Sequence, residues 1–342
     1  MDKKKLKVLV CGCGSIGMRH MANLVALKTN VLCWKPGNYS TYQQEFINNN
    51  NIRVTKNVDD GINRANAVVI ASPADSHIEI ALNCLAKKKA IYIEKPLSNG
   101  LKNIESIKQM AEGNTIEIGC QLRSHHALKK LCSIIHGSGN IGYYRFSMGH
   151  RIDKWRPGQD YTKLASVSSI KGGGALFELV HMIDLAIWFF GPINQVSAFQ
   201  DKRSKFRITC DDITVINIKH KDGTLGQIQL DMLSPKYHCD IEVVSLEAVY
   251  KIDITKGVLS KETDDGSEIV CNKDESVSRN ELFLRQMGHF IERLSGHEVE
   301  ALCPLQDGIE SLEALIAMTS SAELSQVIRV KDHTSGMTGL CK

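Results

Sequence analysis

The sequence has no uninterrupted apolar run of the ~18 to 20 residues that a membrane-spanning helix needs. The longest candidate, residues 175–190, is interrupted by Glu178, His181 and Asp184. The N-terminal stretch MDKKKLKVLV is basic and then apolar, but it leads into a glycine-rich turn without a small-residue cleavage site. We therefore expect neither a membrane segment nor a signal peptide.

A marked excess of one charge is also missing. The 42 basic and 38 acidic side chains are interspersed and give a net charge of +4, so a nucleic-acid-binding surface is not expected. The 11 cysteines form no CxxC pair, and a chain of 342 residues has core enough without disulfides. We interpret them as free thiols in a reducing compartment, which predicts a cytoplasmic protein with no metal site.

The length suggests about two domains. In the first part of the chain, short apolar strands alternate with stretches of helical spacing, which favours right-handed βαβ crossovers and a parallel sheet. The expected strands are residues 7–10, 31–34, 68–71, 91–93 and 116–119. This pattern predicts an α/β domain over residues 1–122, with a Rossmann dinucleotide-binding fold.

The remaining residues, 123–342, show a different pattern. Helices are expected over residues 125–136 and 175–190 and near 279–295 and 306–327, and a strand over 143–148. Four further strands, over 195–199, 213–218, 225–230 and 238–244, follow one another without helices between them. Consecutive strands favour a largely antiparallel open sheet, so we predict an α+β domain.

A glycine fingerprint lies between the first strand and the helix that follows it. Gly12 permits a tight turn, Gly14 lets the backbone approach a pyrophosphate, and Gly17 allows close packing of the helix. Ser15 and Ile16 complete the turn and place their amides at the helix N-terminus, where an anion binds. The motif predicts a dinucleotide site, although a structural turn without a ligand has the same pattern.

The second strand ends at Trp34-Lys35-Pro36, without the acidic residue that would bind a ribose 2′-hydroxyl. Lys35 could instead meet a 2′-phosphate, or it could be an exposed loop lysine. We expect NAD or NADP as the cofactor, with a weak preference for NADP.

Two further groups carry potential chemistry. Glu94-Lys95-Pro96 follows a strand, at the sheet edge where open α/β sheets bind ligands. Three glycines, Gly172 to Gly174, precede Glu178 and His181, whose spacing of three puts them on one face of the expected helix. A histidine can take the proton of an alcohol while hydride leaves its carbon. A surface lysine and a self-satisfied polar helix interface are the alternatives.

Taken together, these motifs resemble the Gfo/Idh/MocA oxidoreductases, the family of glucose–fructose oxidoreductase and inositol dehydrogenase. The resemblance runs nearly end to end. It rests on the turn from Gly12 to Gly17, Ala71-Ser72-Pro73 with His77, Glu94-Lys95-Pro96, the triple glycine before Glu178 and His181, and Pro304, Asp307 and Gly308.

The resemblance implies roles for individual residues. Lys95 would hold the reacting hydroxyl, His181 would be the acid/base, and Glu178 stands where the family usually has an aspartate. On the cofactor side, Ser72, Pro73 and His77 would line the nicotinamide, Glu94 would contact a ribose or fix Lys95, and Gln121 would face the site. Arg123 would open the second domain and contact the substrate.

The stretch Trp155-Arg156-Pro157-Gly158-Gln159-Asp160-Tyr161 precedes the triple glycine. Trp155, Arg156 and Tyr161 fit a sugar ring with an anionic group, as in a branch of the family associated with bacterial surface-sugar biosynthesis; a loop packed on the sheet is the alternative.

We therefore expect hydride transfer between NAD(P) and a ring hydroxyl or ketone of a sugar, sugar phosphate or nucleotide sugar. The alternatives are a relative that uses tightly bound NAD transiently, as in hydrolysis or epimerisation, and a non-catalytic nucleotide-binding regulator. Because the open face of the second sheet would leave a large apolar patch, we also expect a homodimer or homotetramer.

Overall fold

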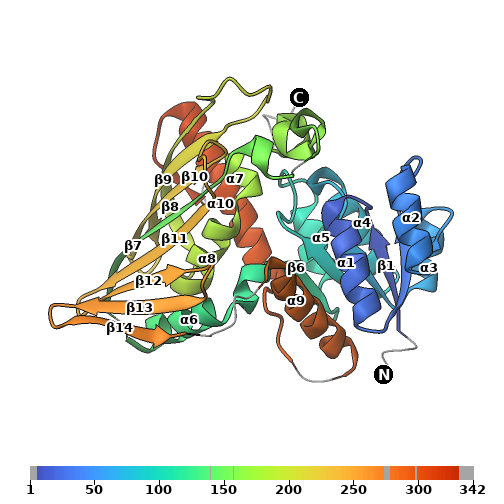
Figure 1. Cartoon of the computed structure of the whole chain (residues 1–342), viewed down its shortest axis with the longest axis horizontal. Helices are drawn as coiled ribbons and strands as arrows, with labels where there is room; N and C mark the ends of the chain where they lie inside the picture. Colours follow the sequence, from blue (N-terminus) through green and yellow to red (C-terminus); the bar gives the residue numbers. More distant parts are fainter. Residues whose placement is uncertain (1–5, 139, 157, 273–277, 297–298, 331–342) are drawn as a thin grey trace. The chain divides into compact units, whose positions relative to one another are not determined.

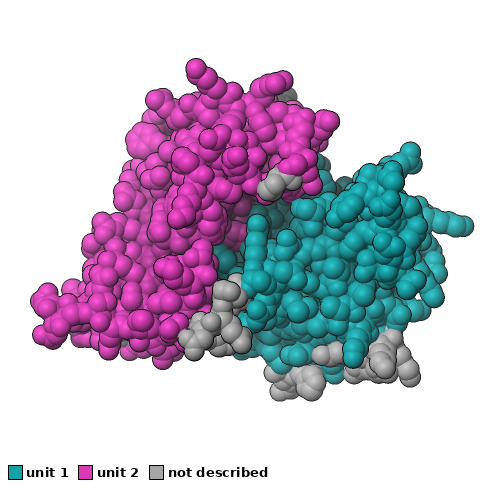
Figure 2. All heavy atoms as spheres, viewed as in Figure 1, with its two compact units in different colours: residues 1–98, 102–124, 278–308 teal, residues 99–101, 125–277, 309–342 magenta. Residues whose placement is uncertain are grey.

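The computed structural model describes residues 6–138, 140–156, 158–272, 278–296 and 299–330. The chain divides into two compact units, coloured separately in Figure 2. The first unit comprises residues 1–98, 102–124 and 278–308, and the second comprises 99–101, 125–277 and 309–342. The junction after Ser124 lies close to the expected boundary at 122. The structure differs from the expected division in two respects, because residues 99–101 belong to the second unit and residues 278–308 return to the first.

The first unit is built on a six-stranded parallel sheet in the order β3-β2-β1-β4-β5-β6. Its strands are β1 Lys7–Cys11, β2 Asn30–Trp34, β3 Arg53–Val54, β4 Ala67–Ile70, β5 Ala90–Glu94 and β6 Ile116–Gly119. This is the Rossmann order, in which the order of the strands across the sheet reverses between β1 and β4. The predicted α/β fold is confirmed, and β3 is a short edge strand that the sequence pattern did not indicate.

Helices cover both faces of this sheet (Figure 1). They are α1 Ser15–Ala26, α2 Thr41–Asn49, α3 Val58–Arg64, α4 His77–Ala86, α5 Ile104–Met110 and α9 Arg279–Leu294. Helix α9 packs beside α1, and its apolar side chains Met287, Phe290 and Ile291 belong to the same buried core as Val8 and Met21. The late helix thus completes a core that begins with the first strand.

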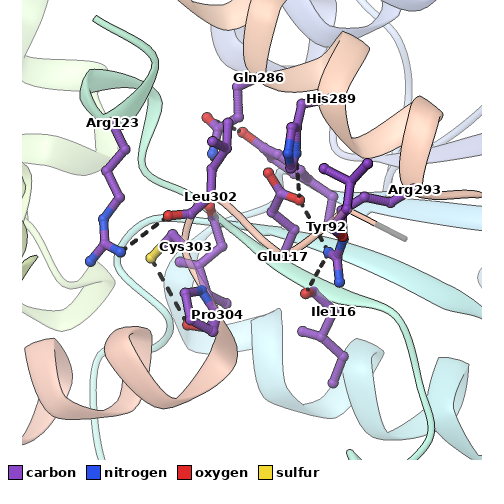
Figure 3. A network of polar contacts seen from close by, with 12 residues as sticks. Tyr92, Ile116, Glu117, Arg123, Gln286, His289, Arg293, Leu302, Cys303 and Pro304 are labelled. Atoms are coloured by element: carbon purple, nitrogen blue, oxygen red, sulfur yellow. Dashed lines mark hydrogen bonds and ion pairs between the residues drawn. The ribbon is translucent and has the colours of Figure 1, made fainter. Parts of the chain in front are cut away.

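A buried carboxylate fixes α9 against β6 (Figure 3). Glu117 is fully buried, and its Oε2 lies 3.1 Å from Arg293 Nη1 and 3.4 Å from His289 Nδ1. Arg293 Nη1 also donates to Ile116 O over 3.0 Å. A buried charge without a partner is strongly destabilising, so these contacts tie the end of the sheet to α9.

Two hydrogen bonds extend this network to the centre of the sheet. Gln286 Nε2 donates to Ile118 O over 2.8 Å, and Tyr92 Oη donates to Gln286 Oε1 over 2.9 Å. The buried amide of Gln286 therefore bridges β5 and β6 from α9 (Figure 3).

The second unit is built on a nine-stranded sheet in the order β14-β13-β12-β11-β7-β10-β9-β8-β15. Its strands are β7 Ile141–Gly149, β8 Ile193–Asp201, β9 Ile213–His220, β10 Leu225–Asp231, β11 His238–Ser245, β12 Val249–Asp253, β13 Val258–Thr263, β14 Gly266–Cys271 and β15 Ile328–Arg329. The predicted, largely antiparallel sheet is confirmed, with β7 and β10 paired in parallel. Helices α6 His126–Ser138, α7 Ala175–Glu178, α8 His181–Phe190 and most of α10 Leu305–Leu324 complete the unit.

The prediction of a single helix over residues 175–190 is wrong. The chain forms α7 and α8, which Leu179 and Val180 separate, and Met182 N donates to Leu179 O, three residues back. The axes of residues 169–178 and of α8 differ in direction by 54° at this break. No single described helix is long and apolar enough to cross a membrane, and only this bent pair, taken together, has the length and composition for it. Glu178 and His181 therefore do not share one continuous helix face.

The open face of the second sheet is also not the large apolar patch that we expected. Cross-strand polar contacts cover it: Arg145 Nε donates to Glu242 Oε1 over 2.8 Å, and Ser147 Oγ donates to Asp240 Oδ2 over 3.1 Å. Phe199, which is 70% exposed, lies opposite Val215, so this face also carries apolar side chains. Alternation along each strand sends apolar side chains inward and mostly polar ones outward.

The inward face contains a close contact at Gly226. This glycine on β10 lies opposite Tyr144 on β7, and an added Cβ would come 1.9 Å from Tyr144 Cζ. The Tyr144 ring stacks on Phe190 at a centroid distance of 4.5 Å, and its Oη lies 2.9 Å from His220 Nε2. His220 Nδ1 donates to Gly191 O over 2.8 Å. Burial lowers the pKa of His220, so its neutral ring accepts a hydrogen bond from the Tyr144 hydroxyl.

Gly226→Ala should lower the free energy of unfolding by about 1–3 kcal/mol, because the methyl group displaces the Tyr144 ring from a close-packed position. Urea denaturation measures the change. Gly142→Ala on β7 is the matched control, since its Cβ would meet only Val244 O at 3.4 Å. Equal stability of the two variants would contradict the assigned contact.

Candidate active site

The candidate residues are distributed over both units. In the first unit, the glycine turn joins β1 to α1 at the point where the order of the strands reverses. Gly12 has φ +114°, and a Cβ there would lie 2.3 Å from Ala71 O, so only glycine fits. A Cβ on Gly17 would lie 2.2 Å from Gly12 O. Gly17 therefore allows α1 to approach the backbone of the turn at Gly12, whereas the nearest other side chain, Ala71, is farther away.

Gly14 differs from these two glycines because nothing lies within 4 Å of its added Cβ. It is the N-cap of α1, and no side chain caps the helix. Gly14 and Ser15 are exposed, and Ile16 is half-buried. An uncapped helix N-terminus next to open space fits the pyrophosphate of a dinucleotide.

Lys35 lies at the end of β2, where the sequence places it. Its Nζ donates to Pro36 O over 3.2 Å and to Asn38 O, and it lies 5.2 Å from the centre of the Tyr39 ring. A depression of about 650 Å³ adjoins it, and Lys56 also lines this depression. Two lysines and no carboxylate line the place where an adenosine ribose would approach, which suits an anionic substituent.

The loop after β4 is held to the loop after β5 by His77. The buried ring places Nε2 2.8 Å from Ser72 O and Nδ1 3.1 Å from Pro96 O. Burial lowers the pKa of His77, so the neutral ring donates to one of the two carbonyls. The Ser72 hydroxyl lies 2.7 Å from Ser76 Oγ, which donates to Pro73 O. The His77 ring thus lies between a carbonyl of the loop after β4 and a carbonyl of the loop after β5.

Glu94 and Lys95 follow at the end of β5. Glu94 is buried; its Oε1 lies 2.6 Å from His20 Nε2, and its Oε2 accepts the Lys95 amide over 3.2 Å. Gly119 on β6 leaves room for this carboxylate, since a Cβ there would come 3.0 Å from Glu94 Oε1. Both oxygens of Glu94 are therefore held, one of them through the backbone of Lys95.

His20 is a site residue that the sequence reasoning missed. It lies on α1 and is fully buried, with its ring edge-on to Tyr92 and Phe283. Its Nδ1 has no hydrogen-bond partner among the described residues. A neutral ring that donates from Nε2 to Glu94 leaves no buried N–H unpaired. Its position three residues after Gly17 was the available signal.

Gln121 and Arg123 lie in the short helix η3 Gln121–Ser124 at the end of the first unit, and both are buried. Arg123 Nη1 lies 2.6 Å from Asp307 Oδ2 and 3.1 Å from Leu302 O, the latter contact visible in Figure 3. The guanidinium therefore fastens the returning segment of residues 278–308.

In the second unit, His181 is the first residue of α8 and is buried. Asp184 follows three residues later on the same helix and is also buried. Glu178 is the last residue of α7 and is half-buried.

Asp211, which the sequence reasoning also missed, holds the triple-glycine turn before these residues. Its Oδ2 accepts Leu176 N over 3.1 Å, so the carboxylate caps the N-terminus of α7. Gly174 has φ +119°, and a Cβ there would come 2.1 Å from Asp211 Oδ1. Burial raises the pKa of Asp211. The carboxylate and the glycine together fix the chain that leads to His181.

Trp155, Arg156 and Tyr161 are half-buried in the loops before this turn. The Trp155 indole donates to His150 O over 2.7 Å. The Tyr161 hydroxyl accepts Arg207 N over 3.3 Å, and its ring packs edge-on to Phe206. Trp155 is therefore tied within its own loop, whereas Tyr161 contacts a second loop.

The sequence agrees with this architecture. Residues 6–119 match the family described as an oxidoreductase family with an NAD-binding Rossmann fold, and residues 129–260 match the Gfo/Idh/MocA C-terminal domain. The chain belongs to the Gfo/Idh/MocA family. It is an oxidoreductase of the NAD-binding Rossmann type.

Two curated relatives in this family are similar over different lengths. A glucose-6-phosphate 3-dehydrogenase of Bacillus subtilis is 28% identical over 54% of this chain, and the match spans 53% of that enzyme. An inositol 2-dehydrogenase of Paenarthrobacter aurescens is 23% identical over 92% of this chain and 96% of its own length.

Solved structures of similar fold extend over almost the whole chain. An oxidoreductase from Agrobacterium radiobacter in complex with NAD⁺, L-tartaric acid and magnesium has a TM-score of 0.81 at 16% identity, with 96% of this chain and 99% of that chain covered. A UDP-N-acetylglucosamine 3-dehydrogenase from Acidithiobacillus ferrooxidans has a TM-score of 0.77 at 16% identity, with 94% and 98% covered.

Within this Gfo/Idh/MocA chain, removal of one partner of the His20–Glu94 pair should be costly. His20→Ala should lower the free energy of unfolding by about 3 kcal/mol, because the Glu94 carboxylate stays buried without its donor. The His20→Ala/Glu94→Ala double variant should lose less than the sum of the two single losses. Urea denaturation of all four proteins gives the coupling; strict additivity would rule out a stabilising pair.

Proposed function

We propose that the chain is an NAD(P)-dependent oxidoreductase that transfers hydride between the nicotinamide and a ring hydroxyl or ketone of a sugar, sugar phosphate or nucleotide sugar. The position of Lys95 carries the proposal. Lys95 follows β5 at the carboxyl edge of the parallel sheet, and its amide is bonded to a carboxylate that α1 holds through His20. The same helix begins at the open dinucleotide turn.

The glycine turn and the loops after β2, β4 and β5 would hold the cofactor. When bound, the nicotinamide supplies the hydride acceptor for oxidation or the donor for reduction. Gly14 and the first amides of α1 would face the pyrophosphate, and Ser72, Pro73 and the backbone fixed by His77 would form the adjoining wall. Gln121 and Glu94 would support the cofactor side from buried positions.

Two side chains would handle the reacting oxygen. The ammonium of Lys95 would hold the hydroxyl and stabilise the alkoxide as its proton leaves. An imidazole nitrogen of His181 would take that proton in oxidation and return it in reduction. Glu178 would act beside His181 from the end of α7.

The relatives support the choice of a sugar-like substrate. Those described above are dehydrogenases of glucose 6-phosphate, inositol and UDP-N-acetylglucosamine. A role in the biosynthesis of surface-polysaccharide sugars is part of the proposal and rests on the resemblance of residues 155–161.

Location and assembly also belong to the proposal. A cytoplasmic homodimer or homotetramer accords with the family resemblance. A monomeric mass at micromolar concentration in light scattering would refute the assembly.

Lys95→Met should keep cofactor binding and lose most turnover, on the order of a hundredfold or more, because an oxyanion would lose its charged partner. Lys102→Met, an exposed position in the same unit, is the control for the loss of one charge. Steady-state kinetics on a panel of sugars, with cofactor affinity measured in parallel, tests this. Unchanged turnover would remove Lys95 from the mechanism.

A thermal-shift titration with NAD⁺, NADH, NADP⁺ and NADPH should raise the melting temperature, more strongly with the NADP pair, because ligands of the native state stabilise it. Lys35→Asp should remove most of the difference between the two pairs, whereas Lys102→Asp should not. A larger shift with NAD(H) would refute the role of Lys35. The absence of any shift from protein free of carried-over nucleotide would favour the non-catalytic alternative.

A further inference from the structure

Two segments of the second unit hold an excess of basic side chains. The first basic segment, residues 151–171, has five lysines and arginines and two aspartates. The second basic segment, residues 201–207, has four basic residues, Lys202, Arg203, Lys205 and Arg207, and one aspartate. Their combined charge of +6 exceeds the +4 of the whole chain. The remaining sequence is therefore slightly acidic, and the net positive charge of the chain comes from these two segments.

The two segments pack on each other although they are distant in sequence. The rings of Tyr161 and Phe206 meet edge to face at a centroid distance of 5.6 Å. Arg207 N donates to the Tyr161 hydroxyl oxygen over 3.3 Å, and the Arg151 guanidinium lies 5.7 Å from the centre of the Phe206 ring. Aromatic contacts thus hold two positively charged loops side by side.

Hydrogen bonds beyond the second basic segment strengthen this arrangement. Thr209 N donates to Val167 O over 3.0 Å, and Ser169 N donates to Thr209 Oγ1 over 3.1 Å. These bonds attach the chain after residue 207 to the short helices η6 Ala165–Val167 and η7 Ser169–Lys171. The contacts of Arg207 and Thr209 therefore hold the end of the second basic segment against the first and oppose the repulsion between them.

The acidic residues of the segments offset only part of the charge. Asp153, Asp160 and Asp201 pair with Arg151, Lys163 and Arg203, each within its own segment. Over the described ranges, no acidic side chain forms an ion pair with Lys171, Lys202 or Lys205, and all three lysines are exposed. Exposed cations on two adjoining loops, without counter-charges, favour a bound anion.

The first basic segment is joined directly to the turn that leads to His181. Gly173 N donates to Ser168 O over 2.9 Å, and Gly174 N donates to Ser166 O over 3.0 Å. A Cβ on Gly173 would come 2.5 Å from Ser166 O, so the turn and the segment are in close backbone contact. A substrate held by the basic segments is thereby anchored on the same rigid stretch of chain as the acid/base.

We propose that the two basic segments anchor a phosphoryl group of the substrate, so that the enzyme acts on a phosphorylated or nucleoside-diphosphate-linked sugar and not on a neutral sugar or polyol. The inference rests on the proposed function. Lysine and arginine are the side chains that bind phosphate oxygens through charge-assisted hydrogen bonds. The anchor extends beyond Arg156 and Tyr161 to residues 202–207, which no sequence motif marked.

Isothermal titration calorimetry on the full chain, saturated with its cofactor, tests the anchor with glucose 6-phosphate, UDP, inorganic phosphate and glucose as probes. We expect glucose 6-phosphate or UDP to bind and glucose not to bind at the same concentrations. Tighter binding of UDP would identify a nucleotide-linked substrate, and tighter binding of glucose 6-phosphate a sugar phosphate. Inorganic phosphate that binds as well as both would show an adventitious ion only and overturn the proposal.

The variant Lys202→Glu/Lys205→Glu should weaken binding of the preferred probe about tenfold or more, because two charge-assisted contacts become repulsive. Lys129→Glu/Lys130→Glu, on the exposed side of α6, changes the net charge equally and should leave affinity within about twofold. Equal losses in both variants would show a general charge effect and overturn the anchor, as would binding unaffected by either. The melting temperature of each variant confirms that it is folded.

Cofactor binding and turnover separate this proposal from the function on which it rests. Turnover of a neutral polyol that Lys202→Glu/Lys205→Glu does not change would overturn the anchor and leave the oxidoreductase intact. Specific binding of UDP or glucose 6-phosphate without cofactor binding would retain the anchor and refute the proposed function.

Discussion

The first unit depends on a carboxylate that the sheet buries completely. Glu117 faces the core from β6, the last strand of the parallel sheet, and an unpaired charge there would cost several kcal/mol. Its partners, Arg293 and His289, come from α9, more than 170 residues later in the chain. The same helix supplies Met287, Phe290 and Ile291 to the core beneath α1. The unit that carries the glycine turn is therefore completed only when the chain has returned to it.

In each unit a carboxylate fixes the chain next to a candidate catalytic residue. Glu94 is held by His20 and in turn binds the amide of Lys95. Asp211 caps α7, from which the chain continues to His181. In both places a glycine, Gly119 or Gly174, makes the room that the carboxylate occupies. Both carboxylates act on the backbone next to the candidate residues and so fix the course of the chain there.

The distribution of charge gives the second unit its own character. The open sheet face pairs charges across strands, as Arg145 does with Glu242. In the basic segments, in contrast, several lysines have no counter-charge among the described residues. The two segments are held together through the ring contact of Tyr161 and Phe206. Repulsion between like charges costs stability, so a fold that fixes such an arrangement gains most when an anion occupies it.

Short-range patterns in the sequence determined much of this protein. Alternating strands and helices predicted the Rossmann half, and the spacing of Gly12, Gly14 and Gly17 predicted the dinucleotide turn, because turn geometry and helix periodicity involve neighbouring residues. Tertiary structure alone decided the break between Glu178 and His181, the return of α9 to the first sheet, and the partners of Glu94, Glu117 and Asp211. Those features depend on buried groups that must find partners far along the chain, and no local pattern encodes which partner the fold will bring.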